Sequence, residues 1–179
     1  VTFGYDPAKP VLRDVDLVIE AGQTVALVGE TGAGKSTIAK LVVRFHDPQS
    51  GAITIDGHDL SQVTLRSLRS QLGVVPQEPF LFNGTIRDNL AFADPDASDE
   101  RLLQAVELVG LSELIDQLGD GLDSLVHERG LSLSAGERQL LALGRAFLAG
   151  PRVLVLDEAT SSLDLRSEAR IEAALDKLL

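Results

Sequence analysis

Short apolar runs alternate with amphipathic segments along the chain, and glycine or proline separates many of them. Residues 15–19 alternate apolar and polar side chains, which predicts a half-buried strand. Residues 24–28 form an apolar run that predicts a short buried strand. Residues 35–45 then carry apolar side chains at helical spacing. A strand, a glycine-rich turn and a helix in this order form half of a βαβ unit.

Further strands are predicted at residues 53–55, 72–75 and 152–156. The dipeptide Asp56-Gly57 follows the first of these strands and predicts a turn. Apolar strands that alternate with helices are typical of a mainly parallel sheet covered on both faces. We therefore expect an α/β fold with a mainly parallel sheet and a small antiparallel portion at the N-terminus.

The stretch of residues 78–149 has helix signals and few strand candidates. Ser98 caps one predicted helix and Gly110 ends it; a shorter helix ends at Gly119. The first of these helices has an apolar face formed by Leu102, Leu103, Val106 and Val109. A last helix near the C-terminus presents Ile171, Ala174, Leu175 and Leu178. The expected organisation is one domain, whose core comprises residues 1–77 and 150–179 around an inserted helical subdomain at 78–149.

Composition removes several classes of function. The 179 residues carry a formal net charge of -11, without a basic cluster, which disfavours nucleic acid as a partner. The chain has no cysteine, and its three histidines (His46, His58 and His127) lack metal-ligand spacing, so we expect them at the surface. No apolar run reaches the roughly 20 residues that span a bilayer. The chain has no methionine and begins at Val1 in an apparent strand, which indicates an excerpt of a longer polypeptide.

The strongest chemical signal is a phosphate-binding loop at residues 29–37. Two glycines separated by four residues precede Lys35 and Ser36, the pattern in which main-chain amides and a helix start surround phosphate oxygens. Lys35 would neutralise the phosphates and Ser36 would bind Mg²⁺. The predicted nucleotide-binding residues are Gly29, Glu30, Thr31, Gly32, Ala33, Gly34, Lys35, Ser36 and Thr37. The alternative is a glycine-rich turn that only links a strand to a helix, and the flanking predicted strand and helix make it the weaker interpretation.

A complementary signal follows the predicted strand at 152–156. Asp157 and Glu158 lie at its C-terminal end, where open α/β sheets bind ligands. Asp157 would hold Mg²⁺, and Glu158 would polarise the water that attacks the γ-phosphate. The two carboxylates could also simply end a strand in a solvated loop. The chain lacks the Asn-Lys-x-Asp motif of guanine recognition, so adenine is the expected base.

Four further segments resemble motifs of a known family. Residues 133–137 (Leu-Ser-Ala-Gly-Glu) resemble the Leu-Ser-Gly-Gly-Gln signature, and residues 159–164 resemble the D-loop. Residues 126–130 resemble the X-loop of exporters, with His127 where glycine is usual, and residues 80–86 follow the exporter pattern. The chain therefore resembles the nucleotide-binding domains of ABC transporters, most closely the exporter type, over nearly its whole length.

The resemblance implies roles for residues that are unremarkable alone. Tyr5 would stack on adenine, and Gln77 would serve both Mg²⁺ and the hydrolytic reaction. Ser134 and Gly136 would contact the γ-phosphate bound by a partner domain. The D-loop and X-loop residues implied are Asp164 and Glu128.

The resemblance also implies an activity, partners and a location. The chain would hydrolyse Mg-ATP to ADP and phosphate. ATP would drive head-to-tail dimerisation with a second nucleotide-binding domain, identical or different, and move attached transmembrane domains. The domain would lie at the cytoplasmic face of the inner cell membrane. Two alternatives are a soluble ABC-type mechanical ATPase acting on nucleic acid or ribosomes, and a nucleotide-binding module that hydrolyses ATP negligibly.

Three departures from the family pattern bear on these roles. Ala135 replaces a glycine and Glu137 replaces the signature glutamine. Ser134 and Glu137 have the spacing of a capping box, so the Glu137 carboxylate could fold back onto the Ser134 amide. No histidine occurs between Asp164 and Leu179, where the family's switch histidine is expected.

Overall fold

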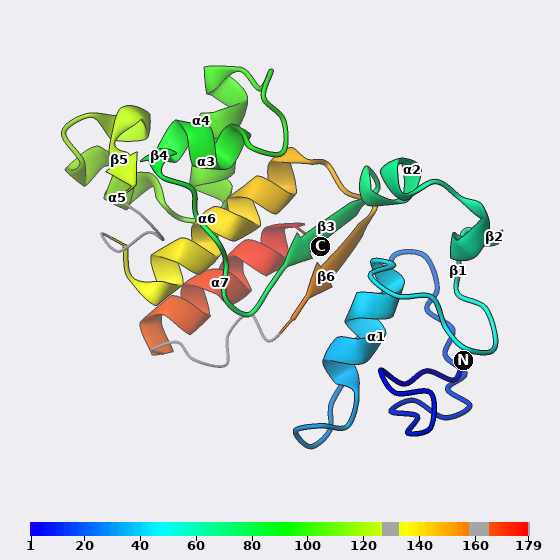
Figure 1. Ribbon diagram of the computed structural model, residues 1–179. Helices are drawn as coiled ribbons and strands as arrows, with labels where there is room; N and C mark the ends of the chain where they lie inside the picture. Colours follow the sequence, from blue (N-terminus) through cyan, green and yellow to red (C-terminus); the bar gives the residue numbers. More distant parts are fainter. Residues whose placement is uncertain (127–132, 158–164, 179) are drawn as a thin grey trace. The chain divides into compact units, whose positions relative to one another are not determined.

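The chain forms two compact units, Val1–Leu72 and Gly73–Leu179. The computed structural model describes residues 1–126, 133–157 and 165–178. No helix in these ranges is long and apolar enough to cross a bilayer. Both α-helices and short β-strands are present, in agreement with the predicted α/β class (Figure 1).

The first unit contains short helices and one β-hairpin. Its elements are α1 (Lys35–Val42), β1 (Thr54–Ile55), β2 (His58–Asp59), the 3₁₀ helix η1 (Leu60–Gln62) and α2 (Leu65–Arg69). Strands β1 and β2 pair antiparallel around Asp56 and Gly57, whose φ angles are 51° and 78°. Two consecutive positive φ angles match the right-handed twist of a hairpin, so the Asp-Gly turn predicted from the sequence is confirmed.

The N-terminal residues of the first unit pair with two other segments. Thr2 forms an antiparallel bridge with Ser50, and Phe3 forms one with Leu12. Phe3, Leu12 and Leu41 are the buried centre of this unit. Partly buried apolar residues surround them: Val1, Val15, Ile38 and Ile53. A small core thus holds α1 against the N-terminal segment that precedes it.

Residues 15–28 do not form the two strands that their pattern predicted. Leu17 is 49% exposed and Val28 is 93% exposed. Within the segment, the amide of Gln23 donates to the carbonyl of Glu20 in a turn at 3.1 Å. A hydrophobic pattern reports which side chains favour burial, whereas a strand also needs a neighbouring strand with which to pair. The strand prediction for this segment is therefore wrong.

The second unit is organised around α6 (Ala135–Leu148). This helix packs against α3 (Ile86–Ala91), α4 (Asp99–Leu108) and α7 (Leu165–Leu178) (Figure 1). The other elements are β3 (Leu72–Val75), β4 (Gly84–Thr85), α5 (Ser112–Gln117), the 3₁₀ helix η2 (Gly121–Asp123), β5 (Leu125–Val126) and β6 (Val153–Leu156). Apolar side chains from these helices form one large core.

The strands of the second unit form two small sheets. Strand β3 pairs with β6, and their arrows run in the same direction in Figure 1. Strand β4 pairs antiparallel with β5. Together with the hairpin of the first unit, the described residues contain three two-stranded sheets. The apolar pattern located β3 and β6, but it does not fix how many strands join one sheet.

The helix signals of the second unit were more reliable. Helix α4 begins after Ser98, whose hydroxyl accepts a hydrogen bond from the Arg101 amide at 3.4 Å, and Gly110 follows its end with a φ of 72°. Three residues of its predicted apolar face are buried: Leu102, Val106 and Val109. Leu103 is 50% exposed, so its assignment to that face was wrong, because it lies 100° around the helix from Leu102.

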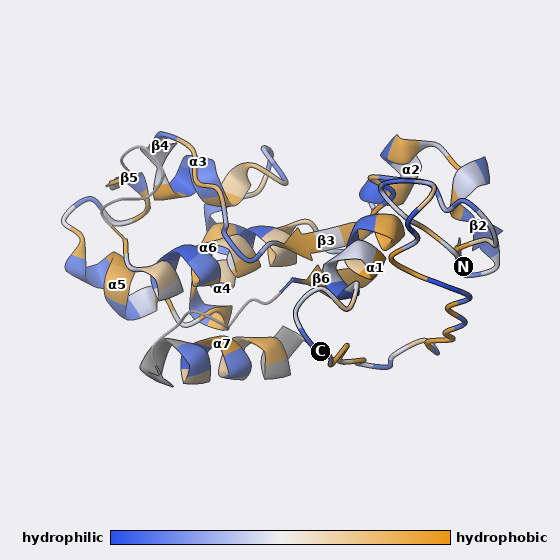
Figure 2. Ribbon diagram, turned by 60° about the horizontal axis from the view of Figure 1, so that its bottom comes forward, coloured by the Kyte–Doolittle hydropathy of each residue, from blue (hydrophilic) through white to orange (hydrophobic). Residues whose placement is uncertain are grey.

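Helix α7 also follows its predicted pattern. Ile171 and Ala174 are buried, and Leu175 packs against the same core. Hydrophilic and hydrophobic residues alternate along this helix in Figure 2. Such alternation is expected when one face of a helix packs against a core and the other faces solvent.

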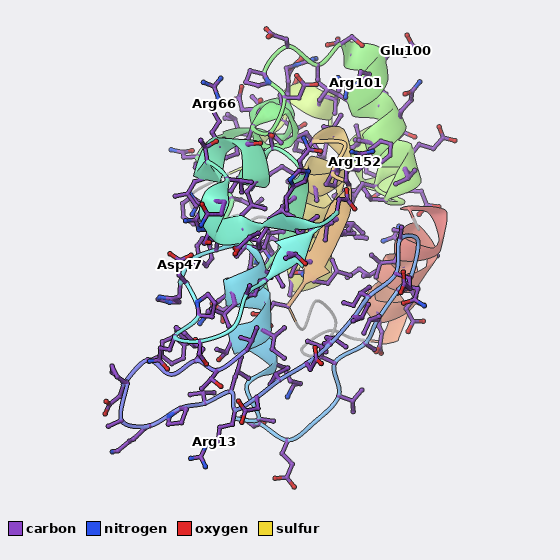
Figure 3. The ribbon with its side chains drawn as sticks, turned by 90° about the vertical axis from the view of Figure 1, so that its right-hand side faces the viewer. Arg13, Asp47, Arg66, Glu100, Arg101 and Arg152 are labelled. Atoms are coloured by element: carbon purple, nitrogen blue, oxygen red, sulfur yellow. The ribbon has the colours of Figure 1, made fainter. Side chains whose placement is uncertain are left out.

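An arginine on α4 ties this helix to the end of α6. Arg101, labelled in Figure 3 beside Glu100 on the first turn of α4, forms an ion pair with Asp94. It also donates to the main-chain carbonyl of Leu148 at 3.2 Å. A guanidinium at this carbonyl complements the negative end of the α6 dipole.

Candidate nucleotide-binding site

The glycine-rich loop leads directly into α1. Gly34 is the N-cap of this helix and has a left-handed φ of 96°. A Cβ atom added to Gly34 would lie 2.7 Å from Cδ2 of Leu12. Both the conformation and the close approach therefore require glycine. A glycine also places no side-chain cap on the first-turn amides, which suits a helix start that binds an anion.

Lys35 connects the two ends of the phosphate loop. Its Nζ donates to the carbonyls of Gly29 at 2.8 Å and Glu30 at 3.0 Å. The Ala33 amide closes a turn onto the Glu30 carbonyl at 3.1 Å. An ammonium, turn amides and the positive end of α1 are thus concentrated within a few residues. This combination attracts the oxygens of a phosphate chain.

The other predicted loop residues differ in their access to a ligand. Thr31 and Gly32 are exposed. Ser36 is half-buried in the first turn of α1, whereas Thr37 is only 6% exposed. Of the two hydroxyls in this turn, the one on Ser36 is therefore better placed to meet a ligand or an ion.

Tyr5 lies beside the helix that follows the loop. Its hydroxyl is 3.3 Å from the Thr37 hydroxyl, and its residue surface is 54% exposed. The ring makes edge contacts with Phe3 and His46, at centroid distances of 5.3 and 5.5 Å. The Lys40 ammonium lies 5.8 Å from the ring centroid. An exposed, laterally supported aromatic ring offers a surface on which a base can stack.

The histidines predicted to lie at the surface can be compared in part with the structure. His46 and His58 are exposed, as expected. His127 lies outside the described residues.

The second unit carries the polar residues that follow β3 and β6. The Asp157 amide donates to the Val75 carbonyl at 3.0 Å, so Asp157 continues the pairing of the two strands. Gln77 follows the end of β3 by two positions and is exposed. Strands β3 and β6 run in the same direction (Figure 1), and Gln77 and Asp157 both follow the C-terminal ends of these paired strands. An amide oxygen and a carboxylate are ligands that Mg²⁺ accepts.

The predicted signature segment forms the capped start of α6. The Ser134 hydroxyl accepts from the Glu137 amide at 3.2 Å, and the Glu137 carboxylate accepts from the Ser134 amide at 2.7 Å. The predicted capping box and the folding back of Glu137 are both confirmed. Gly136 is buried in the same turn. This helix start therefore already holds a negative side chain of its own.

Sequence reasoning missed three polar residues that the structure buries wholly or in part. Asn89 is fully buried, Gln139 is 3% exposed, and Arg145 is half-buried. Arg145 donates to the Asn89 side-chain oxygen at 2.9 Å. A signal existed in the sequence for one of them, because Arg145 interrupts the otherwise apolar stretch of residues 140–148.

The predicted site residues are distributed over both units. Lys35 and Ser36 belong to the first unit, and Gln77, Ser134 and Asp157 belong to the second. Three predicted site residues lie outside the described residues: Glu128, Glu158 and Asp164.

Comparisons with known proteins agree with the nucleotide-binding chemistry. The ABC transporter family model matches residues 12–161. The chain is 51% identical over 178 residues to the uncharacterized ABC transporter ATP-binding protein YwjA of Bacillus subtilis, and the match covers 99% of this chain and 31% of YwjA. It is 46% identical over 179 residues to the mitochondrial iron-sulfur clusters transporter atm1 of Neurospora crassa, covering 100% of this chain and 25% of that protein.

A solved structure extends the comparison to the fold. The structure of a bacterial Atm1-family ABC exporter with ATP bound matches with a TM-score of 0.92 and 44% sequence identity, over 98% of this chain and 31% of that one. The chain thus spans 25% to 31% of these three proteins. The matches define a phosphate-loop ATPase domain with an α/β fold. The chain belongs to the ABC transporter family, as an ATP-binding domain of the exporter type.

Proposed function

We propose that this domain hydrolyses Mg-ATP to ADP and phosphate and thereby drives an ABC exporter. The observation that carries the proposal is the Lys35 ammonium, which bridges the Gly29 and Glu30 carbonyls at a helix start that Gly34 leaves without a side-chain cap. Cation, amides and helix dipole together favour a triphosphate. Residues 29–37 would hold the phosphates, and the exposed ring of Tyr5 would stack on adenine.

The residues proposed to hold Mg²⁺ have suitable donor atoms. Ser36, Gln77 and Asp157 offer a hydroxyl, an amide oxygen and a carboxylate, all hard oxygen ligands of the kind that Mg²⁺ prefers. Ser36 lies in the first turn of α1, and Asp157 follows β6. When bound, Mg²⁺ would supply positive charge that neutralises the phosphate oxygens. The chemistry of these donors therefore fits Mg²⁺.

Three residues would carry the hydrolytic step. Lys35 would stabilise the negative charge on the β- and γ-phosphate oxygens. Glu158, the residue after Asp157, would accept a proton from the attacking water or orient that water. Gln77 would help to position the same water from the end of β3.

Other residues would serve the partner domains. Ser134 and Gly136 would contact the γ-phosphate bound by a second nucleotide-binding domain, which gives a head-to-tail dimer with two ATP molecules between the domains. Asp164 would lie in the D-loop at that dimer interface. Glu128 would lie in the X-loop that faces the transmembrane domains. ATP binding would close the dimer, and hydrolysis would reopen it.

We also propose a division of the domain that follows this chemistry. Residues 1–77 and 150–179 would form the ATP-binding core, with a mainly parallel sheet and an antiparallel portion at the N-terminus. Residues 78–149 would form the helical subdomain, and helices α3, α4 and α5 together with α6 all fall within this range. The domain would lie at the cytoplasmic face of the inner cell membrane, joined to transmembrane domains. Its net charge of -11 argues against nucleic acid as a partner.

The proposal is tested by phosphate release from the full-length transporter in lipid. Release should require ATP and Mg²⁺ and should stop when a chelator removes the ion. Glu158→Gln should slow release at least about tenfold while ATP binding persists, on the scale of general-base effects. Unchanged turnover in that variant would exclude Glu158 from the reaction. ATP binding without release by the wild type would support the non-hydrolysing module instead.

A further inference from the structure

Two long polar side chains of α6 donate hydrogen bonds to the segment of residues 76–89. This segment leads from the end of β3 into α3, and Gln77 is its second residue. Residues 76–83 contain neither helix nor strand. Their conformation therefore depends on side-chain bonds rather than on a regular main-chain ladder.

Asn89 fixes the far end of this segment. Its Nδ2 donates to the carbonyls of Phe82 at 3.0 Å and Thr85 at 2.9 Å. Its Oδ1 accepts from the Phe82 amide at 2.9 Å. Asn89 is fully buried, so these bonds are shielded from competing water. Phe82 is thus held by both of its main-chain polar groups.

Arg145 joins this arrangement to α6. Its Nε and Nη2 donate to the main-chain and side-chain oxygens of Asn89 at 2.7 and 2.9 Å, and its Nη1 donates to the Phe80 carbonyl at 2.9 Å. The guanidinium also lies 5.5 Å from the ring centroid of Phe82 and 5.7 Å from that of Phe92. Burial lowers the pKa of Arg145, and no carboxylate among the described residues pairs with it. This position therefore uses the planar guanidinium group of arginine, which directs several hydrogen bonds at fixed angles.

Gln139 fixes the near end of the segment. Its Nε2 donates to the Pro76 carbonyl at 3.2 Å, and Pro76 directly precedes Gln77. Gln139 is 3% exposed, so its amide is committed to this internal bond. Ser134 caps the same helix five positions earlier. One rigid helix thus carries Ser134 and holds the main chain beside Gln77.

We propose that Gln139 and Arg145 are positioning residues that lock the segment carrying Gln77 to α6. The inference rests on the proposed function, in which Ser134 meets the phosphate of the partner's ATP and Gln77 serves the domain's own site. A movement of α6 on closure at Ser134 is then passed to Gln77 through these bonds.

The test compares substitutions in the full-length transporter. Gln139→Leu removes the donor but keeps an apolar side chain of similar size, and Arg145→Lys keeps the charge but loses the fork. Both should lower kcat for ATP about tenfold, the scale expected when a reacting group is misplaced. KM should stay within about twofold, because the phosphate loop that supplies ground-state binding is untouched. Gln104→Leu, at an exposed position of α4, is the matched control and should leave both constants unchanged.

A pH profile separates positioning from simple support of the fold. In Gln139→Glu, only the protonated carboxyl can donate to the Pro76 carbonyl, and burial favours that form. The kcat of this variant relative to the wild type should therefore recover as the pH falls. A residue that merely fills space would give no such recovery.

The outcomes distinguish the inference from the function on which it rests. If the Lys35→Ala variant releases phosphate at the same rate as the wild type, the proposed function itself is contradicted. If Lys35→Ala abolishes release but Gln139→Leu and Arg145→Lys fold normally and retain kcat, only the positioning role is overturned. Loss of the folded state in both Gln139 variants, measured as the thermal unfolding midpoint, would also overturn it, because the residue would then serve the fold.

Discussion

The two helix starts that the sequence marks as phosphate sites are built in opposite ways. Helix α1 follows Gly34, which has no side chain to cap the first-turn amides. Helix α6 follows Ser134, and its capping box closes through the Glu137 carboxylate at 2.7 Å from the Ser134 amide. The first helix start is therefore prepared for an external anion, and the second already satisfies part of its hydrogen-bonding capacity internally.

This difference indicates a division of labour. A phosphate at α1 meets amides, a helix dipole and the Lys35 ammonium, which all attract it. A phosphate at α6 meets a dipole whose attraction is partly offset by the negative charge of Glu137. We therefore expect the start of α1 to bind nucleotide without a partner domain. The start of α6 should contribute only when a partner domain presents its bound nucleotide.

Lys35→Ala should have the largest effect. Charge-assisted hydrogen bonds contribute about 1.5–3 kcal/mol, so the affinity for ATP should fall roughly 10- to 100-fold. Equilibrium binding of a fluorescent ATP analogue measures this change. Lys9→Ala, at an exposed lysine outside the loop, is the control and should bind normally. Undiminished affinity in Lys35→Ala would contradict the assignment of the loop.

Gly34→Ala should disturb the open helix start. The added Cβ atom would lie 2.7 Å from Cδ2 of Leu12, and the alanine would have to adopt a φ of 96°. A residue other than glycine in this conformation costs about 1–3 kcal/mol. Chemical denaturation should report this loss together with weaker ATP binding. Gly119→Ala is the matched control, since its Cβ would meet nothing within 4 Å. Equal stability of the two variants would refute the requirement for glycine at Gly34.

Ser134→Ala should open the closed helix start. Loss of an N-cap hydroxyl costs about 1 kcal/mol, which should appear as a lower denaturation midpoint. ATP affinity at the loop of the same domain should not change, because α1 is untouched. If the monomeric Ser134→Ala variant bound ATP clearly more weakly than the wild type, the two helix starts would not be independent.

Glu137→Gln should keep the cap and remove the charge. The glutamine side-chain oxygen can still accept from the Ser134 amide. Steady-state ATP turnover should therefore be preserved or raised, because no carboxylate at this helix start then repels the negatively charged phosphate. A large loss of turnover, despite normal unfolding behaviour, would show that the carboxylate has a separate role.

Asp88→Asn should have the smallest effect. It removes the carboxylate from the capping box that Thr85 and Asp88 form at the start of α3, where no ligand is proposed. The Thr85 amide donates to the Asp88 carboxylate at 2.8 Å, and this bond lowers the pKa of Asp88 from 3.8. A lowered folded-state pKa adds stability above the unfolded value, and this stability is lost as the pH falls through the folded value. The thermal unfolding midpoint of the variant should lie slightly below that of the wild type at neutral pH. The difference should vanish in acid, and a difference independent of pH would contradict this account.

The features that sequence reasoning recovered are those that close within a few residues. The Asp56-Gly57 turn depends on the conformational preferences of two neighbours, and the Ser134 capping box spans four positions. The glycine-rich turn before α1 is equally local, because Lys35 reaches back only to Gly29. Such features need no knowledge of the rest of the chain.

The features that it missed depend on distant partners. Residues 15–28 have a strand pattern, but no local rule provides the neighbouring strand. The bonds from Arg145 to Asn89 join positions 56 apart in the sequence. The contact between the hydroxyls of Tyr5 and Thr37 spans 32 positions. Side-chain contacts between remote positions require the fold to be known first.

The lysine contacts in the phosphate loop also bear on how binding energy should be understood. The Lys35 ammonium has three N–H donors and contacts two carbonyls, so one donor remains for a ligand phosphate. The two carbonyl contacts fix the position of that donor, so the cation is oriented before the ligand arrives. Variants of the residues that contribute those carbonyls leave the main-chain contacts intact and should therefore change nucleotide affinity less than their closeness to the phosphates suggests.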